Sequence, residues 1–218
     1  MLSHTRLVGA RRRVVCEWNM TGGRPVVAET AVIAPTAVLS GDVHIGADTV
    51  VLAGAVVTAQ GAPVRIGASC VIMENAVVRG AGKYATTLGD HVLVGPHAHI
   101  SGATISHRVF IATGASVFNG AVLETGTVVT INAVVHIGTT CPAGTLVPIG
   151  HIAFGNPARI VPPSEVAIIH QELAALGFTN WVFGVEATSL AAPHTIEALC
   201  QRYSRALRRH GDDRIVDS

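Results

Sequence analysis

The sequence predicts an all-β solenoid: a left-handed parallel β-helix of about six triangular coils, followed by C-terminal α-helices. Three observations lead to this fold class. An aliphatic residue recurs at every sixth position over more than half of the 218 residues. Hydrophobic residues make up 49% of the chain but aromatic residues only 4%, and glycine is abundant, at 23 residues. Helical periodicity is confined to the end of the chain, where the six-residue pattern has stopped.

The first 32 residues precede the repeat, and we expect residues 1–32 to form an N-terminal strand or arm. This segment begins with a cluster of arginines, namely Arg6, Arg11, Arg12 and Arg13. We interpret the cluster as a solvated basic tail. A weak transit-like segment is the alternative, whereas the apolar core of a secretory signal is missing.

The six-residue pattern occupies residues 33–161. Its aliphatic positions continue through two short insertions and one five-residue step: Ile33, Leu39, Ile45, Val51, Val57, Ile66, Ile72, Val78, Leu88, Val94, Ile100, Ile105, Ile111, Val117, Leu123, Val129, Val135, Cys141 and Val147. The period fits a coil with three flat faces and one inward aliphatic residue at each corner. Aromatic side chains would be too large for so narrow a shaft. A β-sandwich, the alternative, would require strict alternation and turns every 8–12 residues.

Residues 162–218 are expected to form a helical extension that packs on the prism. Ser164 is the expected N-cap of a first helix, which Gly177 ends. The second helix has one apolar stripe, and arginines lie on its other face. The stretch "FTNWVFGV" between the helices is apolar and should pack on the solenoid. The stripes are Val166, Ile169, Leu173 and Leu176 in the first helix and Ile196, Leu199, Tyr203 and Leu207 in the second.

Charge and cysteine content exclude several classes of protein. The formal net charge is +1, which gives no field for nucleic acid or a membrane surface. No apolar run reaches the roughly 18 residues of a membrane span. The four cysteines form no CxxC pair, so neither a disulfide framework nor a zinc ribbon is expected, and a reducing cytoplasmic location is the default. They are Cys16, Cys70, Cys141 and Cys200.

Residues 33–161 resemble the γ-class carbonic anhydrase branch of the hexapeptide-repeat superfamily, the ferripyochelin-binding type. The stretches that carry the resemblance are "VLSGDVHIG", "GAVVTAQGAPVRIGASCVIMENAVVRG", "LGDHVLVGPHAHISGATI" and "GNPARIV". Their order, the insertions and the five-residue step all match. The resemblance implies a homotrimer of parallel prisms, with a metal held between adjacent subunits.

The family's three histidine ligands are replaced in this sequence. Their positions correspond to Arg79 in "NAVVR", Pro96 in "GPHA" and Ser101 in "ISG". Proline has no side-chain donor, a neutral hydroxyl is a poor zinc ligand, and arginine is a permanent cation. We therefore expect that the zinc site is lost and that no cofactor remains.

Other functional positions of the family also differ. Its arginine and aspartate correspond to Thr58 and Gln60, and its Gln-Asp pair corresponds to Met73 and Glu74. Only the acidic character of Glu74 survives. The guanidinium of Arg79 would keep a positive charge at the site and could hold a carboxylate or phosphate. We predict ligand binding by Arg79, Ser101, Glu74 and Gln60; pairing of Arg79 with a carboxylate across a trimer interface is the alternative.

Two histidines border this site in "VLVGPHAHISG", where Val94 and Ile100 point inward. His97 and His99 should face outward or toward a neighbouring subunit, away from the family's ligand positions. We interpret them as ordinary surface or interface groups, with a relocated metal site or a catalytic role as weak alternatives. The residues that follow successive inward corners should stack as one outward column: Thr58, Arg79, Ser101, Phe118 and His136.

Three functions remain, the third being a metal hydrolyase with relocated ligands. The first is a homotrimeric scaffold, subunit or small-anion binder without carbonic anhydrase activity. The second is an acyltransferase or CoA-thioester enzyme that uses an interface histidine as general base, with acyl-CoA as ligand. The sequence leaves open whether the chain is an enzyme. Neither nucleic acid nor a membrane is an expected partner.

Overall fold

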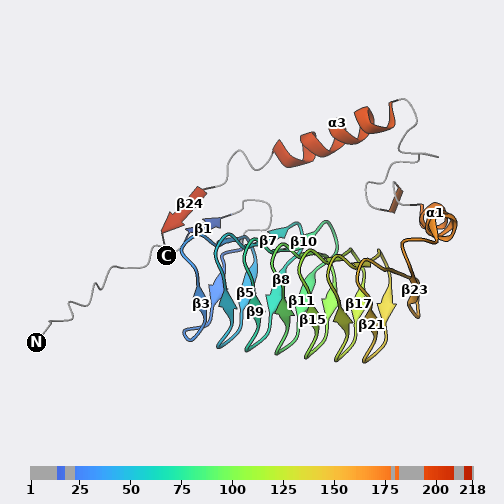
Figure 1. The fold of residues 1–218 in the computed structure, drawn as a ribbon. Coiled ribbons are helices and arrows are strands. Elements are labelled where there is room, and N and C mark those ends of the chain that lie inside the picture. The colour runs from blue at the N-terminus through green and yellow to red at the C-terminus, as the bar shows by residue number, and fades with distance from the viewer. Residues whose placement is uncertain (1–13, 18–22, 178–179, 182–193, 209–213, 218) are drawn as a thin grey trace, which may run out of the picture.

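The computed structural model describes residues 14–17, 23–177, 180–181, 194–208 and 214–217. The described strands form a left-handed β-solenoid of about seven turns with three sheets along its length (Figure 1). Ladder pairing between coils is parallel, and only the two outermost pairs are antiparallel, β22 with β23 and β1 with β24. The predicted fold class is confirmed.

Each sheet collects one strand from every coil. Sheet A, with ten strands, contains β1 (Val14–Glu17), β4 (Val38–Ser40), β7 (Val56–Gln60), β10 (Val77–Ala81), β13 (His99–Ser101), β16 (Ser116–Val117), β19 (Val134–Val135), β22 (Ile152–Phe154), β23 (Arg159–Val161) and β24 (Arg214–Asp217). Sheet B, with seven, contains β2 (Val26–Val27), β5 (Val43–Ile45), β8 (Val64–Ile66), β11 (Thr86–Leu88), β14 (Thr104–Ile105), β17 (Val122–Leu123) and β20 (Thr140–Cys141). Sheet C, also with seven, contains β3 (Val32–Ile33), β6 (Val50–Val51), β9 (Val71–Ile72), β12 (Leu93–Val94), β15 (Phe110–Ile111), β18 (Val128–Val129) and β21 (Leu146–Val147).

The core is the inward column that the sequence predicts. Every aliphatic position of the series from Ile33 to Val147 is buried, most of them completely. The small residues four positions after them, such as Ala55 and Ala98, are also buried. Pairing with the solenoid already begins at Val14, because β1 pairs in parallel with β4 and β2 with β5, and this adds to the six expected coils.

The two insertions lengthen the sheet A strands next to them. Strands β7 and β10 have five residues each, and Ala81 forms an antiparallel bridge with Tyr84. Tyr84 stacks on Trp181 of the C-terminal extension, with ring centroids 4.9 Å apart. Trp181 therefore packs on the solenoid, as expected for "FTNWVFGV"; residues 178–179 and 182–185 of that stretch lie outside the described residues.

The first C-terminal helix, α1 (Val166–Ala175), contains no buried residue. Its N-cap is Glu165, which makes no side-chain capping bond, so the prediction of Ser164 as the cap is wrong. Gly177 has the positive φ of 54° that suits a residue just past a helix end. An ion pair of 3.1 Å between Arg159 and Glu172 joins β23 to α1.

The second described helix, α3 (Thr195–Leu207), lies on the sheet A side of the solenoid, with one end near β10 and the other toward the last coils (Figure 1). Thr195 and Leu199 are buried, whereas Ile196 is 53% exposed. The expected apolar stripe is therefore wrong at Ile196, because Thr195 occupies the buried position one residue earlier. Among the described residues, no helix is long and apolar enough to cross a membrane.

Candidate functional site

A column of polar residues runs along the outer surface of sheet A. The backbone of Arg79 on β10 pairs in register with Thr58 on β7 and Ser101 on β13. Thr58 pairs in turn with Ser40 on β4. Each residue follows an inward corner, so its side chain faces outward. The expected stacking is confirmed for Thr58, Arg79 and Ser101. We call Ser40, Thr58, Arg79 and Ser101 the polar column.

The polar column is buried but poorly satisfied. Ser40, Thr58 and Ser101 are 1%, 7% and 6% exposed. Within the described part of the chain, the buried hydroxyls of Ser40 and Thr58 and the buried Nε of Arg79 have no hydrogen-bond partner. A buried polar group without a partner costs about 1–3 kcal/mol. The three groups lie on adjacent strands of sheet A.

Arg79 is held firmly at its backbone, while its side chain reaches outward. Its carbonyl oxygen accepts hydrogen bonds from Thr86 Oγ1 at 2.6 Å and from the Gly102 amide at 2.9 Å. Its Nη2 donates to the hydroxyl oxygen of Tyr203 on α3, at 3.4 Å. No ion pair joins Arg79 to an acid of the same chain among the residues described. Within the described ranges, no carboxylate balances the charge of the Arg79 guanidinium.

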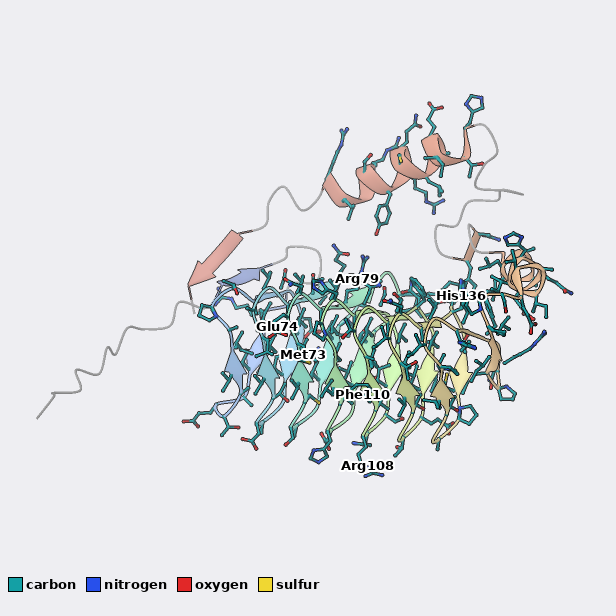
Figure 2. The ribbon with its side chains drawn as sticks, in the orientation of Figure 1. Met73, Glu74, Arg79, Arg108, Phe110 and His136 are labelled. Carbon is teal, nitrogen blue, oxygen red and sulfur yellow. The ribbon has the colours of Figure 1, made fainter. Side chains whose placement is uncertain are left out.

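The other predicted ligand residues lie apart from this column. Glu74 is exposed in the turn before β10, and its carbonyl oxygen accepts from the His97 amide at 3.0 Å. Pro96 occupies the equivalent turn before β13. Gln60 ends β7, two residues beyond Thr58, and is half-buried. Figure 2 shows Glu74 at a distance from Arg79. One chain thus brings Arg79 and Ser101 together but leaves Glu74 and Pro96 at the sheet A–sheet C corner.

The three residues that the resemblance matches to the metal ligands do not have the chemistry of metal ligands. Arg79 is cationic, Pro96 offers no side-chain donor, and Ser101 offers only a neutral hydroxyl. Across the described ranges, no group of three or more His, Cys, Asp or Glu side chains is placed to hold a metal.

His97 and His99 point to different places. His97 is an exposed corner residue with a positive φ of 57°, equivalent to the turn positions of Asn75 and Gly114 in neighbouring coils. His99 is half-buried on the outer surface of sheet A. Burial, and secondly the charge of Arg79, lower the pKa of His99. The lowered pKa favours the neutral form of the His99 imidazole, which lies beside the polar column. His97 lies at the exposed corner instead.

Next to the polar column, aromatic rings alternate with imidazoles. His99 contacts Phe118 with centroids 6.1 Å apart, Phe118 contacts His136 at 5.8 Å, and His136 stacks on Phe154 at 5.2 Å. Burial lowers the pKa of His136. We call His99, Phe118, His136 and Phe154 the ring ladder; it continues the outer surface of sheet A toward the last coil.

Sequence reasoning missed two contributors to this surface. Ser40 follows the inward corner at Leu39, so the rule that found Thr58 could have found it. Tyr203 was expected only as a member of an apolar stripe. Its contact with Arg79 spans 124 positions along the chain, and no local pattern indicates it.

Comparisons with known proteins give distant relatives. No family model matches the chain. The mitochondrial γ-carbonic anhydrase 3 of Arabidopsis thaliana is 33% identical over 120 residues, 52% of this chain and 46% of the relative. γ-Carbonic anhydrase 1 of the same plant is 32% identical over 107 residues, 46% of this chain and 39% of the relative. The chain thus spans less than half the length of these two curated relatives.

Two solved structures are also similar. A hexapeptide transferase family protein from Anaplasma phagocytophilum is 23% identical, covers 80% of this chain and 99% of its own, and has a TM-score of 0.41. An acetyltransferase domain from Neisseria gonorrhoeae is 22% identical, covers 63% of this chain and 57% of its own, and has a TM-score of 0.33. At these TM-scores and sequence identities, the similarity to these structures says nothing about the activity of this chain.

Proposed function

Because this chain is a γ-carbonic-anhydrase-like member of the hexapeptide-repeat family, we propose that it is a self-associating scaffold that binds a small anion at Arg79 and lacks carbonic anhydrase activity. The observation that carries the proposal is the buried, unpartnered Nε of Arg79 beside the unpartnered hydroxyl of Thr58. A guanidinium holds carboxylate or phosphate oxygens through two parallel N–H bonds. Neighbouring hydroxyls can donate to the same oxygens.

Lack of carbonic anhydrase activity follows from the donor set. Hydration of CO₂ by this class of enzyme depends on a metal-bound water, and Arg79, Pro96 and Ser101 do not fit the metal. Elemental analysis of the purified protein and a CO₂ hydration assay test this directly. We expect substoichiometric zinc and no rate above the uncatalysed reaction. Stoichiometric zinc together with activity would refute the proposal.

Anion binding is tested by thermal unfolding in sodium acetate and in sodium phosphate, against sodium chloride of equal ionic strength. We expect at least one of the two oxyanions to raise the Tm, because it satisfies the Arg79 guanidinium. Arg79→Lys should abolish the shift, since lysine cannot form the two parallel bonds. Arg65→Lys is the matched control: Arg65 lies on sheet B, where it pairs with Asp42 at 2.9 Å. If the oxyanion raised the Tm of both variants equally, the assignment of the anion site to Arg79 would be wrong.

Self-association is supported by the outer surface of sheet C. Its outward residues are all apolar, and three are well exposed: Val32 at 47%, Phe110 at 42% and Leu146 at 55%. The corresponding column on sheet B includes His44, Arg65 and Thr104 and is mostly polar. An apolar stripe along the whole prism fits a second copy of this chain in parallel, as in a homotrimer. The stripe is Val32, Val50, Val71, Leu93, Phe110, Val128 and Leu146.

His99 supports the second candidate function, acyl transfer or CoA-thioester chemistry. A general base must be neutral at the working pH, and the lowered pKa of His99 keeps it so. Unfolding scans with a panel of CoA thioesters test this candidate, with His99→Gln as the variant. The candidate is supported if CoA compounds raise the Tm of both the wild type and His99→Gln while only the variant loses thioester turnover. It is excluded if no CoA compound changes the Tm of the wild type.

A further inference from the structure

We propose that the anion at Arg79 is a polyhydroxylated carboxylate, of the chemical class of the sugar acids, whose hydroxyl groups lie along Thr58 and Ser40. This inference rests on the proposed function and deepens it, because it names the class of ligand. Three features carry it: the chemistry of the unpartnered groups in the polar column, the length of the line that they form, and the apolar residues beside that line.

The unpartnered groups of the polar column are of two chemical kinds. Within the described residues they are Nε of Arg79, Oγ1 of Thr58 and Oγ of Ser40, and all three atoms are buried. The Nε can only donate a hydrogen bond, whereas each hydroxyl can both donate and accept. A carboxylate oxygen therefore suits the Nε. A ligand hydroxyl, which also donates and accepts, suits Thr58 and Ser40, which are only 7% and 1% exposed.

The three groups form a line that is longer than a carboxylate. The register pairs Arg79 on β10 with Thr58 on β7, and Thr58 with Ser40 on β4. Neighbouring strands are about 4.8 Å apart, so the line runs roughly 10 Å from Arg79 to Ser40. A carboxylate held by Arg79 lies next to Thr58 but does not extend to Ser40. A ligand that satisfies all three groups must therefore run along the column, with hydroxyl groups beyond its carboxylate.

The surroundings of this line favour one negative charge and a carbon chain. Arg79 is the single charged member of the polar column, and one guanidinium balances one carboxylate through two parallel N–H bonds. Residues two positions apart on a strand face the same side of the sheet. The outward residues two positions before Ser40, Thr58 and Arg79 are half-buried valines: Val38, Val56 and Val77. A polyhydroxylated chain offers C–H groups to the valines and hydroxyl groups to the polar column.

Simpler ligands leave part of the polar column unsatisfied. An alkyl carboxylate would pair with Arg79 but leave the buried hydroxyls of Thr58 and Ser40 without partners. An uncharged polyol would satisfy the hydroxyls but leave the guanidinium without a counter-charge. These two kinds of molecule are therefore the natural comparison ligands for a sugar acid.

The test measures binding of three probes to the full chain by isothermal titration calorimetry at equal ionic strength. Sodium gluconate and sodium hexanoate have the same chain length and charge and differ in their hydroxyl groups, whereas sorbitol has the hydroxyl groups without the charge. Wild type is compared with Arg79→Lys, and with Thr58→Val and Ser40→Ala, which each remove one hydroxyl. Thr104→Val is the matched control, because Thr104 is exposed on β14 of sheet B.

We expect wild type and Thr104→Val to bind gluconate roughly ten-fold more tightly than hexanoate, as for one or two added hydrogen bonds. Thr58→Val and Ser40→Ala should each reduce this preference roughly three-fold and leave the affinity for hexanoate unchanged. Arg79→Lys should weaken the binding of both carboxylates, and sorbitol should not bind. Thr58→Val should also raise the Tm of the ligand-free protein, because it removes a buried hydroxyl that has no partner.

Several results would overturn the inference, and they can be told apart from failure of the proposed function. If hexanoate binds as tightly as gluconate, or if Thr58→Val and Ser40→Ala keep the full preference for gluconate, the ligand class is wrong, although binding at Arg79 stands. If Thr58→Val lowers the Tm of the ligand-free protein, the fold itself needs this hydroxyl, and it is not available to a ligand. If neither carboxylate binds while acetate or phosphate still raises the Tm, this inference alone fails. If those two ions also have no effect, the proposed anion site fails with it.

Discussion

At the scale of single residues, the six-residue register determines whether a side chain points into the shaft or outward. The identity of an outward residue then determines what it can bind. Any side chain at position 79 follows the inward Val78 and must face outward, between positions 58 and 101 on the adjacent strands. An imidazole there could help to bind a metal, whereas the guanidinium of Arg79 repels one and attracts an anion. Under the proposed function, the identity of residue 79 decides the class of ligand while the backbone keeps its place.

The ring ladder predicts how stability depends on pH. Burial lowers the pKa of His99 and His136, so near and below their ordinary pKa the folded chain binds fewer protons than the unfolded chain. The free energy of unfolding should be highest above that pKa and should fall as the pH drops from 7.5 to 5. Tm measured across this range should show the loss.

His136→Phe is the matched variant for this pH dependence. Phe118 and Phe154 flank position 136 with rings already, so a phenyl ring should pack there. We expect the fall in Tm with acid to become shallower, because one buried imidazole no longer resists protonation. An unchanged slope would mean that His136 does not contribute to the acid sensitivity.

At the scale of elements, glycine corners make room for the C-terminal extension. Gly102 has a φ of 56°, and a Cβ at this position would lie 2.6 Å from Tyr84 Cβ. A Cβ at Gly120 would lie 3.3 Å from the Trp181 ring. The stacked pair Tyr84–Trp181 therefore depends on corners without side chains, and this contact joins the second insertion to the extension.

Gly102→Ala and Gly144→Ala should separate backbone strain from steric clash. Both glycines have positive φ, so alanine costs roughly 1–2 kcal/mol of stability at either position. A Cβ at Gly144 meets nothing within 4 Å. Gly102→Ala should cost at least about 1 kcal/mol more, because overpacking against Tyr84 adds to the strain. Chemical denaturation measures both variants, and equal losses would contradict the packing described here.

The coil elements could be predicted from sequence, while the extension could be predicted only in part. Each inward aliphatic residue is set by its neighbours six positions away, so the register from Ile33 to Val147 follows from local pattern. The buried face of α3 depends on tertiary packing, and Thr195 rather than Ile196 is buried. Likewise, the sequence indicated Arg79 and Ser101 through the register, but nothing local indicated Tyr203.

At the scale of the whole molecule, the three outer surfaces differ in character. Sheet A carries the polar column and the ring ladder and forms the side of the solenoid on which α3 lies (Figure 1). Sheet B is mostly polar, with Arg65 paired to Asp42. Sheet C presents an apolar stripe along the prism. A solenoid with one surface for its own helix and one apolar surface for a partner is suited to a scaffold.

Two adjacent substitutions on β15 test this arrangement. Ile111 is completely buried, so Ile111→Asp puts an unpaired charge in the shaft and should cost more than about 4 kcal/mol, abolishing soluble folded protein. Phe110→Asp changes the exposed neighbour and should leave a folded chain that no longer self-associates. Size-exclusion chromatography with light scattering and circular dichroism measure both. Soluble, folded Ile111→Asp would mean that the register is wrong, and undiminished self-association of Phe110→Asp would exclude sheet C as the interface.

The most direct test of the central claim, that an anion replaces the family's metal at Arg79, is X-ray diffraction from crystals grown with sodium acetate, including data at the zinc absorption edge. The account predicts planar density against Nε of Arg79 and no anomalous peak near Arg79, Pro96 or Ser101. An anomalous peak there, with histidine nitrogens coordinating it, would contradict the account.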